Sequence, residues 1–232
     1  MIVFRLLRLM FLTLVFNFRY LPFKQALKLP VFVYQAHFLA LKGKVRIDND
    51  HVRRGMIRLG FPRASTYPRT GITWRNQGEV IFKGSCKIPN DCYIIVGKQA
   101  TLTLGDDFNM NAGTKLVCNC LITLGDHARF GWGCIIMDTN FHPLYDMDNK
   151  RFKKAFGPIV IGDYNWFGTQ CYIMHSVTTP ERCIFGARSM VTRGGQYESY
   201  CVHGGYPVHI LSRNVMRDYD NDQIFDYSLP KE

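Results

Sequence analysis

The feature that most constrains this chain is a six-residue repeat over residues 159–191. Counted in sixes, five of the six in-phase residues are large and apolar: Ile161, Phe167, Ile173, Thr179, Phe185 and Val191. A glycine follows three of them. A period of six fits neither a 3.6-residue helix nor a simple strand alternation, but it is typical of a coil of short strands with a corner after each. The repeat therefore predicts a solenoid whose apolar position points inward.

The same phase begins earlier in the chain. It passes through Leu104, Met110, Leu116 and Ile122, slips by two residues, and resumes at Leu124, Phe130 and Ile136. We interpret the slip as a bulged corner. The regular pattern then breaks once, between Asp138 and Pro158, which predicts a loop insertion at residues 139–158. Such an insertion leaves a solenoid on one face and often carries function.

Three further motifs occur in order within this frame. They are residues 138–142 (DTNFH), 161–168 (IGDYNWFG) and 204–207 (GGYP). Together with the repeat they resemble the hexapeptide-repeat O-acetyltransferases, and the whole chain resembles the branch that acts in polysaccharide, capsule and O-antigen biosynthesis. The resemblance implies an all-β, left-handed parallel β-helix that forms a homotrimer. It also implies transfer of an acetyl group from acetyl-CoA to a sugar hydroxyl of a cell-surface polysaccharide or its lipid-linked precursor. Acetyl-CoA would be a co-substrate, with no cofactor bound permanently.

The 232 residues are enough for one body with appendages. Residues 1–42 are expected to form a short apolar and basic helical segment, since Pro22 and Pro30 can each open a helix. Residues 43–213 are assigned to the β-helix and residues 214–232 to a C-terminal tail without evident chemistry.

The formal charge of +11 arises entirely within residues 1–70. There the basic residues are interleaved with apolar runs, which favours an anionic membrane surface over nucleic acid. The uncharged run between Arg8 and Arg19 is about half the length that a membrane-spanning helix needs. We therefore predict an interfacial helix on a cytoplasmic protein, attached peripherally at the inner membrane face. An uncleaved signal anchor and a plain cap for the end of the solenoid are the alternatives.

Cysteine and histidine spacing bear on metal binding. The eight cysteines contain no CxxC pair, so reduced cytoplasmic thiols are the simplest interpretation. A carbonic anhydrase built on the same repeat would need three zinc-binding histidines, two of them closely spaced. No two of the seven histidines lie closer than six residues apart. We expect no metal.

His142 lies beside the predicted loop, just outside a regular coil. Acetyl transfer from a thioester to an alcohol needs a base, because the alcohol is very weakly acidic whereas a thiol of pKa about 8.5 leaves as an anion. A neutral imidazole can take the hydroxyl proton, which contributes about 10²–10⁴ in rate. The resemblance assigns this role to the histidine of the motif, hence to His142. The alternative is an ordinary surface histidine.

Asp138 and Asn140 precede His142 closely enough to orient its ring or to bind acceptor hydroxyls. Asp138 is the better orienting group, because a carboxylate stabilises an imidazolium. The alternative for both residues is turn chemistry, in which they bond to nearby backbone. A backbone N–H at a corner of the coil could serve as the oxyanion donor.

Acetyl-CoA-binding positions follow from the resemblance, which places the pantetheine arm between neighbouring coils. The matching residues are Trp166, Gly168, Thr169, Ala187, Thr192 and Arg193. For Trp166, core or trimer packing is the alternative. The chain departs from the family at residues 205–209, where His209 replaces a basic residue, so Arg213 is predicted to contact the coenzyme phosphate instead.

Two other functions remain open on the same repeat. One is a non-catalytic scaffold, and the other is a sugar-nucleotide N-acyltransferase, which differs in its acceptor. Four basic residues within loop 143–158 suggest an anionic or phosphorylated acceptor: Lys150, Arg151, Lys153 and Lys154.

Overall fold

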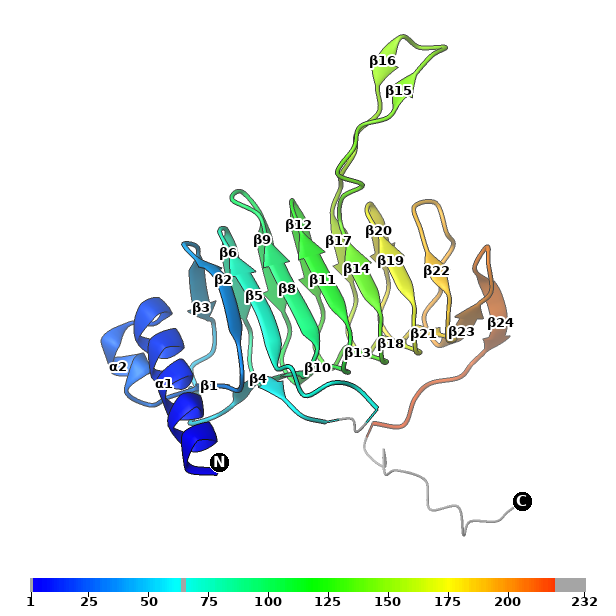
Figure 1. Cartoon of the computed structure of the whole chain (residues 1–232). Coiled ribbons are helices and arrows are strands. Elements are labelled where there is room, and N and C mark those ends of the chain that lie inside the picture. The colour runs from blue at the N-terminus through cyan, green and yellow to red at the C-terminus, as the bar shows by residue number, and fades with distance from the viewer. Residues whose placement is uncertain (1, 64–65, 220–232) are drawn as a thin grey trace, which may run out of the picture.

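Most of the chain winds into a three-sided coil (Figure 1). The computed structural model describes residues 2–63 and 66–219, apart from the side chains of Ile2 and Val3. From β1 to β22, apart from the hairpin of β15 and β16, successive strands go to sheets A, B and C in turn, and each pairs in parallel with its counterpart one turn away. At the C-terminal end β23 returns to sheet A, and β24 pairs with it in antiparallel. The winding is left-handed. The predicted left-handed parallel β-helix is therefore confirmed.

The strands of the three sheets follow the turns of the coil. Sheet A contains β1 (Val31–Val33), β4 (Ile57–Phe61), β7 (Cys86–Pro89), β10 (Phe108–Met110), β13 (Arg129–Phe130), β18 (Trp166–Phe167), β21 (Ile184–Phe185), β23 (Cys201–Gly204) and β24 (His209–Arg213). Sheet B contains β2 (His37–Leu41), β5 (Ile72–Asn76), β8 (Cys92–Val96), β11 (Lys115–Cys118), β14 (Ile135–Met137), β19 (Tyr172–Met174) and β22 (Met190–Val191). Sheet C contains β3 (Lys44–Ile47), β6 (Glu79–Phe82), β9 (Thr101–Leu104), β12 (Leu121–Leu124), β17 (Ile159–Ile161) and β20 (Val177–Thr179).

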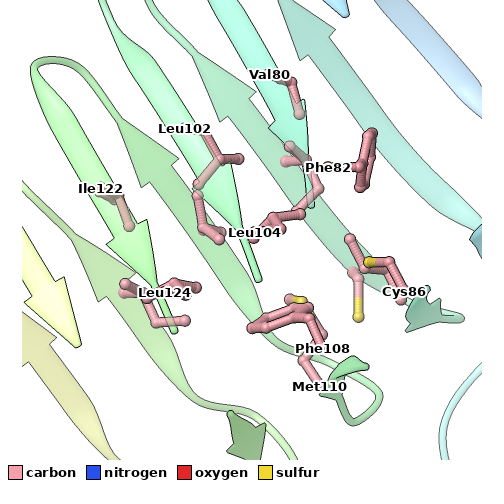
Figure 2. Close-up of a cluster of buried hydrophobic side chains, with 14 of the residues drawn as sticks. Val80, Phe82, Cys86, Leu102, Leu104, Phe108, Met110, Ile122 and Leu124 are labelled. Atoms are coloured by element: carbon pink, nitrogen blue, oxygen red, sulfur yellow. The ribbon is translucent and has the colours of Figure 1, made fainter. Parts of the chain in front are cut away.

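The in-phase residues of the repeat line the inside of the coil. All six of those counted from Ile161 are at most 3% exposed. Figure 2 shows the equivalent inward side chains of earlier turns, among them Leu104 and Leu124. Ile159 pairs with Val177, three hexads later, whereas Thr101 pairs with Leu121, two residues more than three hexads. The extra residues lie between β11 and β12, where the sequence pattern slips.

Aromatic rings stack along the inner side of sheet A. The ring centroids of Phe130 and Phe167 are 4.6 Å apart, and those of Phe167 and Phe185 are 4.5 Å apart. His203 continues the stack, 5.0 Å from Phe185. Each such pair adds about 0.5–1.5 kcal/mol beyond the burial of its area. The stack therefore helps to hold successive turns in register.

The N-terminal end of the coil is closed by α1 (Ile2–Tyr20). Its buried Asn17 donates to the carbonyl of Val31 (2.7 Å) and accepts from the Val31 N–H (3.2 Å), while Thr13 Oγ1 accepts from the Val33 N–H (3.1 Å). These bonds satisfy the free edge of β1, which would otherwise invite pairing with another chain. Helix α1 therefore caps the N-terminal end of the coil, which was one of the alternatives for this segment.

The helical segment expected over residues 1–42 is shorter than the sequence suggested. After α1 the described part of this segment contains only one further helix, α2 (Phe23–Ala26). The helix expected after Pro30 is wrong, because Val31–Val33 and His37–Leu41 form β1 and β2. The reason is tertiary: β1 hydrogen-bonds to β4 on one edge and to α1 on the other. Neither helix in the described part of the chain combines the length and apolar character that a membrane span requires.

His203 generates a prediction about pH. Its Nε2 accepts from the Glu198 N–H (3.1 Å) and its Nδ1 faces the Ile184 carbonyl (3.3 Å), so the buried ring is held in its neutral form. Burial lowers the pKa of His203. The unfolded chain, with an ordinary histidine pKa of about 6.5, then binds the proton more readily, so stability is lost as pH falls below that value.

Urea unfolding at pH 7.5 and 5.5 measures this loss. His203→Gln keeps an acceptor for the Glu198 N–H and removes the titration, so its stability should depend less on pH than that of the wild type. His51→Gln, at an exposed position, serves as the control and should behave as the wild type. Equal pH dependence in all three proteins would contradict the assignment.

Candidate functional site

Residues 139–158 leave the coil between β14 and β17 as an arm (Figure 1). Thr139 bridges Phe156, and the Asn140 N–H donates to the Ala155 carbonyl (2.7 Å) at the base of the arm. The tip is an antiparallel hairpin of β15 (Tyr145–Asp146) and β16 (Arg151–Phe152). The arm therefore starts at the corner between sheets B and C, which we call the B–C corner.

Asp138 lies fully buried at the start of this arm. Its carboxylate accepts from three successive backbone N–H groups, those of Asn119 (2.7 Å), Cys120 (2.7 Å) and Leu121 (2.9 Å). These residues form the corner that carries the two extra residues of the slipped repeat. Among the described residues, no hydrogen bond joins Asp138 to His142. The arrangement agrees with the turn-chemistry alternative rather than with orientation of the His142 ring.

His142 is exposed at the base of the arm. Its N–H donates to the Asn140 carbonyl (2.7 Å), and the Phe141 N–H donates to Thr139 Oγ1 (2.9 Å). Phe141 has φ of 60°, a left-handed conformation that is uncommon for an aromatic residue. This tight turn leaves the imidazole accessible from solvent.

Asn140 is held by a histidine that the sequence interpretation missed. Asn140 Nδ2 lies 3.1 Å from His175 Nε2, and His175 Nδ1 lies 3.1 Å from Ser176 Oγ. Since an amide nitrogen only donates, His175 Nε2 is the acceptor in this contact. The repeat places residue 175 at the B–C corner of the turn after Asp138, and this position is the signal that could have found it.

Four of the six residues matched to acetyl-CoA binding gather at the corner between sheets A and B, the A–B corner. Trp166 begins β18 and is 37% exposed, and Gly168 and Thr169 follow in the corner. Ala187 occupies the same corner one turn later. A Cβ on Gly168 would lie 2.7 Å from the Ala187 nitrogen, so only glycine allows this close stacking.

The other two residues, Thr192 and Arg193, follow β22 and lie on the far side of sheet B. They line a hollow of about 610 Å³ together with His209 and Arg213. Arg213 pairs with Glu198 (3.2 Å) at its edge. The structure thus brings Arg193 and Arg213 to one hollow, and β22 lies between Arg193 and the A–B corner.

The C-terminal tail packs back across sheet A, which the sequence did not indicate. The Arg217 guanidinium carbon lies 4.8 Å from the Trp166 ring centroid, and the Tyr219 ring lies 5.3 Å from that of Tyr164. The tail therefore covers part of the surface beside Trp166. Residues 220–232 of the predicted tail lie outside the described residues.

The fold and this arrangement define a parallel β-helix with an exposed histidine arm and a glycine-lined corner. No family model matches the chain. The sequence is 27% identical over 131 residues to polysialic acid O-acetyltransferase of Escherichia coli O1:K1, covering 56% of this chain and 41% of that protein. It is 25% identical over 131 residues to galactoside O-acetyltransferase of Escherichia coli K12, covering 56% and 62%. The predicted resemblance to O-acetyltransferases is confirmed.

The chain spans less than two thirds of the length of these relatives. Among solved structures, a polysialic-acid-specific acetyltransferase aligns with a TM-score of 0.46 at 19% identity, over 84% of this chain and 82% of that one. A galactoside acetyltransferase in complex with coenzyme A aligns with a TM-score of 0.40 at 15% identity, over 97% and 88%.

Asp138→Asn tests whether the Asp138 carboxylate stabilises the fold. An amide would turn a donor toward at least one of the three N–H groups and leave it unsatisfied, which costs about 1–3 kcal/mol of the free energy of unfolding. Urea unfolding measures the loss. Asp148→Asn, an exposed position at the tip of the arm, is the matched control and should change little. Equal stability of the two variants would contradict the role assigned to Asp138.

Proposed function

We propose that this protein is an acetyl-CoA-dependent O-acetyltransferase that modifies a sugar hydroxyl of a cell-surface polysaccharide or its lipid-linked precursor. The observation that carries the proposal is the exposed His142 at the base of the arm, in the 138–142 motif that resembles those of the hexapeptide-repeat O-acetyltransferases. The ring has no partner among the described residues that would occupy it in a structural role. It is therefore available to a substrate hydroxyl.

The proposed reaction is a single direct transfer. His142 takes the proton of the acceptor hydroxyl while the oxygen attacks the thioester carbonyl of acetyl-CoA, and a tetrahedral oxyanion forms. Its collapse breaks the C–S bond and expels the coenzyme thiolate, which receives the proton from the imidazolium. The products are the acetyl ester of the sugar and free coenzyme A, and no external reductant or metal is needed for the balance.

For the donor, we propose that acetyl-CoA runs along the A–B corner beside Trp166, Thr169 and Ala187. Gly168 lets two backbones approach each other closely there, and the partly exposed indole of Trp166 can pack against the pantetheine arm. Thr192, Arg193 and Arg213 would hold the more polar end, since guanidinium groups bind phosphates in a bidentate manner. The hollow that these residues line supports this assignment.

The outer face of sheet B supports assembly into a homotrimer. Six of its outward side chains are large, mostly apolar and half-buried or exposed: Tyr93, Ile135, Met137, Tyr172, Met174 and Met190. The exposed Lys115 lies between Tyr93 and Ile135 on this face. The equivalent face of sheet C instead carries threonines, among them Thr103, Thr123 and Thr178. An apolar sheet face of this extent is typical of an interface. We propose that other copies of this chain cover it.

Assembly would also complete the site. The His142 arm leaves one edge of sheet B, at the B–C corner, and the Trp166 group lies at the opposite edge, at the A–B corner. One copy alone therefore does not join base and donor. If sheet B faces a three-fold axis, the B–C corner of one copy meets the A–B corner of the next.

His142→Ala tests the base. Removing the imidazole should lower kcat by about 10²–10⁴ while leaving acetyl-CoA affinity unchanged, because the ring acts on the acceptor hydroxyl rather than on the donor. Titration calorimetry with acetyl-CoA and thiol release with glycan acceptors measure the two quantities. His37→Ala, an exposed histidine on β2, is the control.

Two outcomes would overturn the proposal. If the wild type fails to bind acetyl-CoA, the repeat serves as a scaffold or uses another donor. If His142→Ala turns over as fast as the wild type, the base lies elsewhere. Transfer to an amine in preference to a hydroxyl would favour the N-acyltransferase alternative.

We also propose that the protein is peripheral at the inner membrane face, held by α1. The side of α1 opposite the buried Phe16 exposes a row of large apolar residues three or four positions apart: Phe4, Leu7, Phe11, Leu14 and Phe18, which are 41–72% exposed. Basic residues flank this row, and the first acidic residue of the chain is Asp48. This pattern is typical of an interfacial helix on anionic lipid.

Leu7→Gln combined with Phe11→Gln tests the attachment. Binding to vesicles that contain phosphatidylglycerol should weaken by at least about tenfold, since burying each side chain contributes about 1.5–3 kcal/mol. Met147→Gln with Phe152→Gln, an exposed apolar pair on the arm, is the matched control and should bind normally. Sedimentation with vesicles measures binding, and equal binding of both variants would exclude α1 as the anchor.

A further inference from the structure

A second hollow lies beside the arm, on the side toward the N-terminus. It has a volume of about 480 Å³ and opens at the B–C corner over three turns of the coil. Phe141, the residue before His142, lines it, and Ile95 and Val117 form its floor. The hollow is therefore adjacent to the proposed base and is separate from the hollow formed by Arg193 and Arg213.

The charged residues of this hollow are of one sign. Arg75 and Lys98 line it, and no acidic side chain is present among the described residues of its wall. Neither residue forms an ion pair within the described part of the chain. Arg75 donates only to the side chain of Gln77 (3.2 Å). Two cations that lack carboxylate partners thus face the same space, and an anionic ligand would relieve their repulsion.

The remaining polar groups suit a carbohydrate. Gln77, Gln99 and Asn119 each bring an amide that can both donate to and accept from hydroxyl groups. Phe141 is 61% exposed at the wall, where its ring can cover the apolar face of a sugar. Amides with an aromatic wall recognise hydroxyl-rich rings, whereas the two cations recognise a carboxylate or phosphate attached to such a ring.

We infer that this hollow is the acceptor subsite and that it selects a glycan bearing a negatively charged group, bound through Arg75 and Lys98. The inference rests on the proposed function, because it takes His142 as the base that meets the acceptor. It goes further in naming the chemical class of the acceptor and the two residues that distinguish it from a neutral glycan. The basic residues of the arm agree in sign with this choice.

The experiment uses an array of acidic oligosaccharides, each paired with its carboxyl-reduced, neutral counterpart. Full-length wild type should bind acidic members at least about tenfold more tightly than their neutral partners. Arg75→Gln with Lys98→Gln should lose this preference and retain the wild-type affinity for acetyl-CoA. Lys44→Gln, an exposed lysine on β3 outside the hollow, should behave as the wild type.

Each result decides the matter. Binding confined to neutral glycans, absence of binding to any acidic glycan, or an unchanged preference in the double variant would overturn the inference. Acetyl-CoA affinity, measured separately, distinguishes this failure from failure of the proposed function, which would abolish donor binding in the wild type as well. If the double variant misfolds, the wild type still provides a test, because screening by added salt should weaken binding of acidic glycans and spare neutral ones.

Discussion

The structure depends on the stacking of similar turns at close range. Each turn buries an apolar residue on each sheet, and the next turn places the same kind of residue directly above it, so a continuous apolar column fills the coil. At the corners the backbones come so close that side chains are excluded. A Cβ on Gly125 would lie 2.6 Å from the Gly162 carbonyl carbon. The hexad of the sequence is thus the direct consequence of one steric requirement repeated along an axis.

A regular stack of turns leaves backbone groups unpaired at its ends and at its interruptions. Polar side chains hydrogen-bond to these groups in both places. At the N-terminal end, Asn17 satisfies the free edge of β1, because an unpaired strand edge would otherwise attract other chains. At the corner that contains the two extra residues, the Asp138 carboxylate accepts hydrogen bonds from three backbone N–H groups that have no partner in a regular ladder of strands. The arm that carries His142 begins next to this corner. The irregular corner of the coil and the exposed histidine therefore lie close together.

Much of this could be predicted from the sequence. The six-residue repeat, its two-residue slip and the position of His142 beside a loop are local features of the chain. The structure shows each of them in the region where the sequence pattern predicts it. Other features could not be predicted because they depend on distant partners. The segment after Pro30 contains strands β1 and β2 rather than a helix, because β4 and α1 border β1. Asp138 faces a corner 17 to 19 residues earlier in the chain, and Asn140 meets His175 from the following turn.

The sequence by itself therefore determined the coil, since a six-residue period has few other ways to bury its apolar residues. It also identified the histidine that the arm exposes. Only the tertiary structure decided which side chains share a surface. It placed the His142 arm and the Trp166 corner on opposite edges of sheet B, and it brought Arg75, Lys98 and Phe141 around one hollow. The physical reason is that coil geometry sets neighbours by turn and corner, and insertions of unequal length hide that relation in the linear sequence.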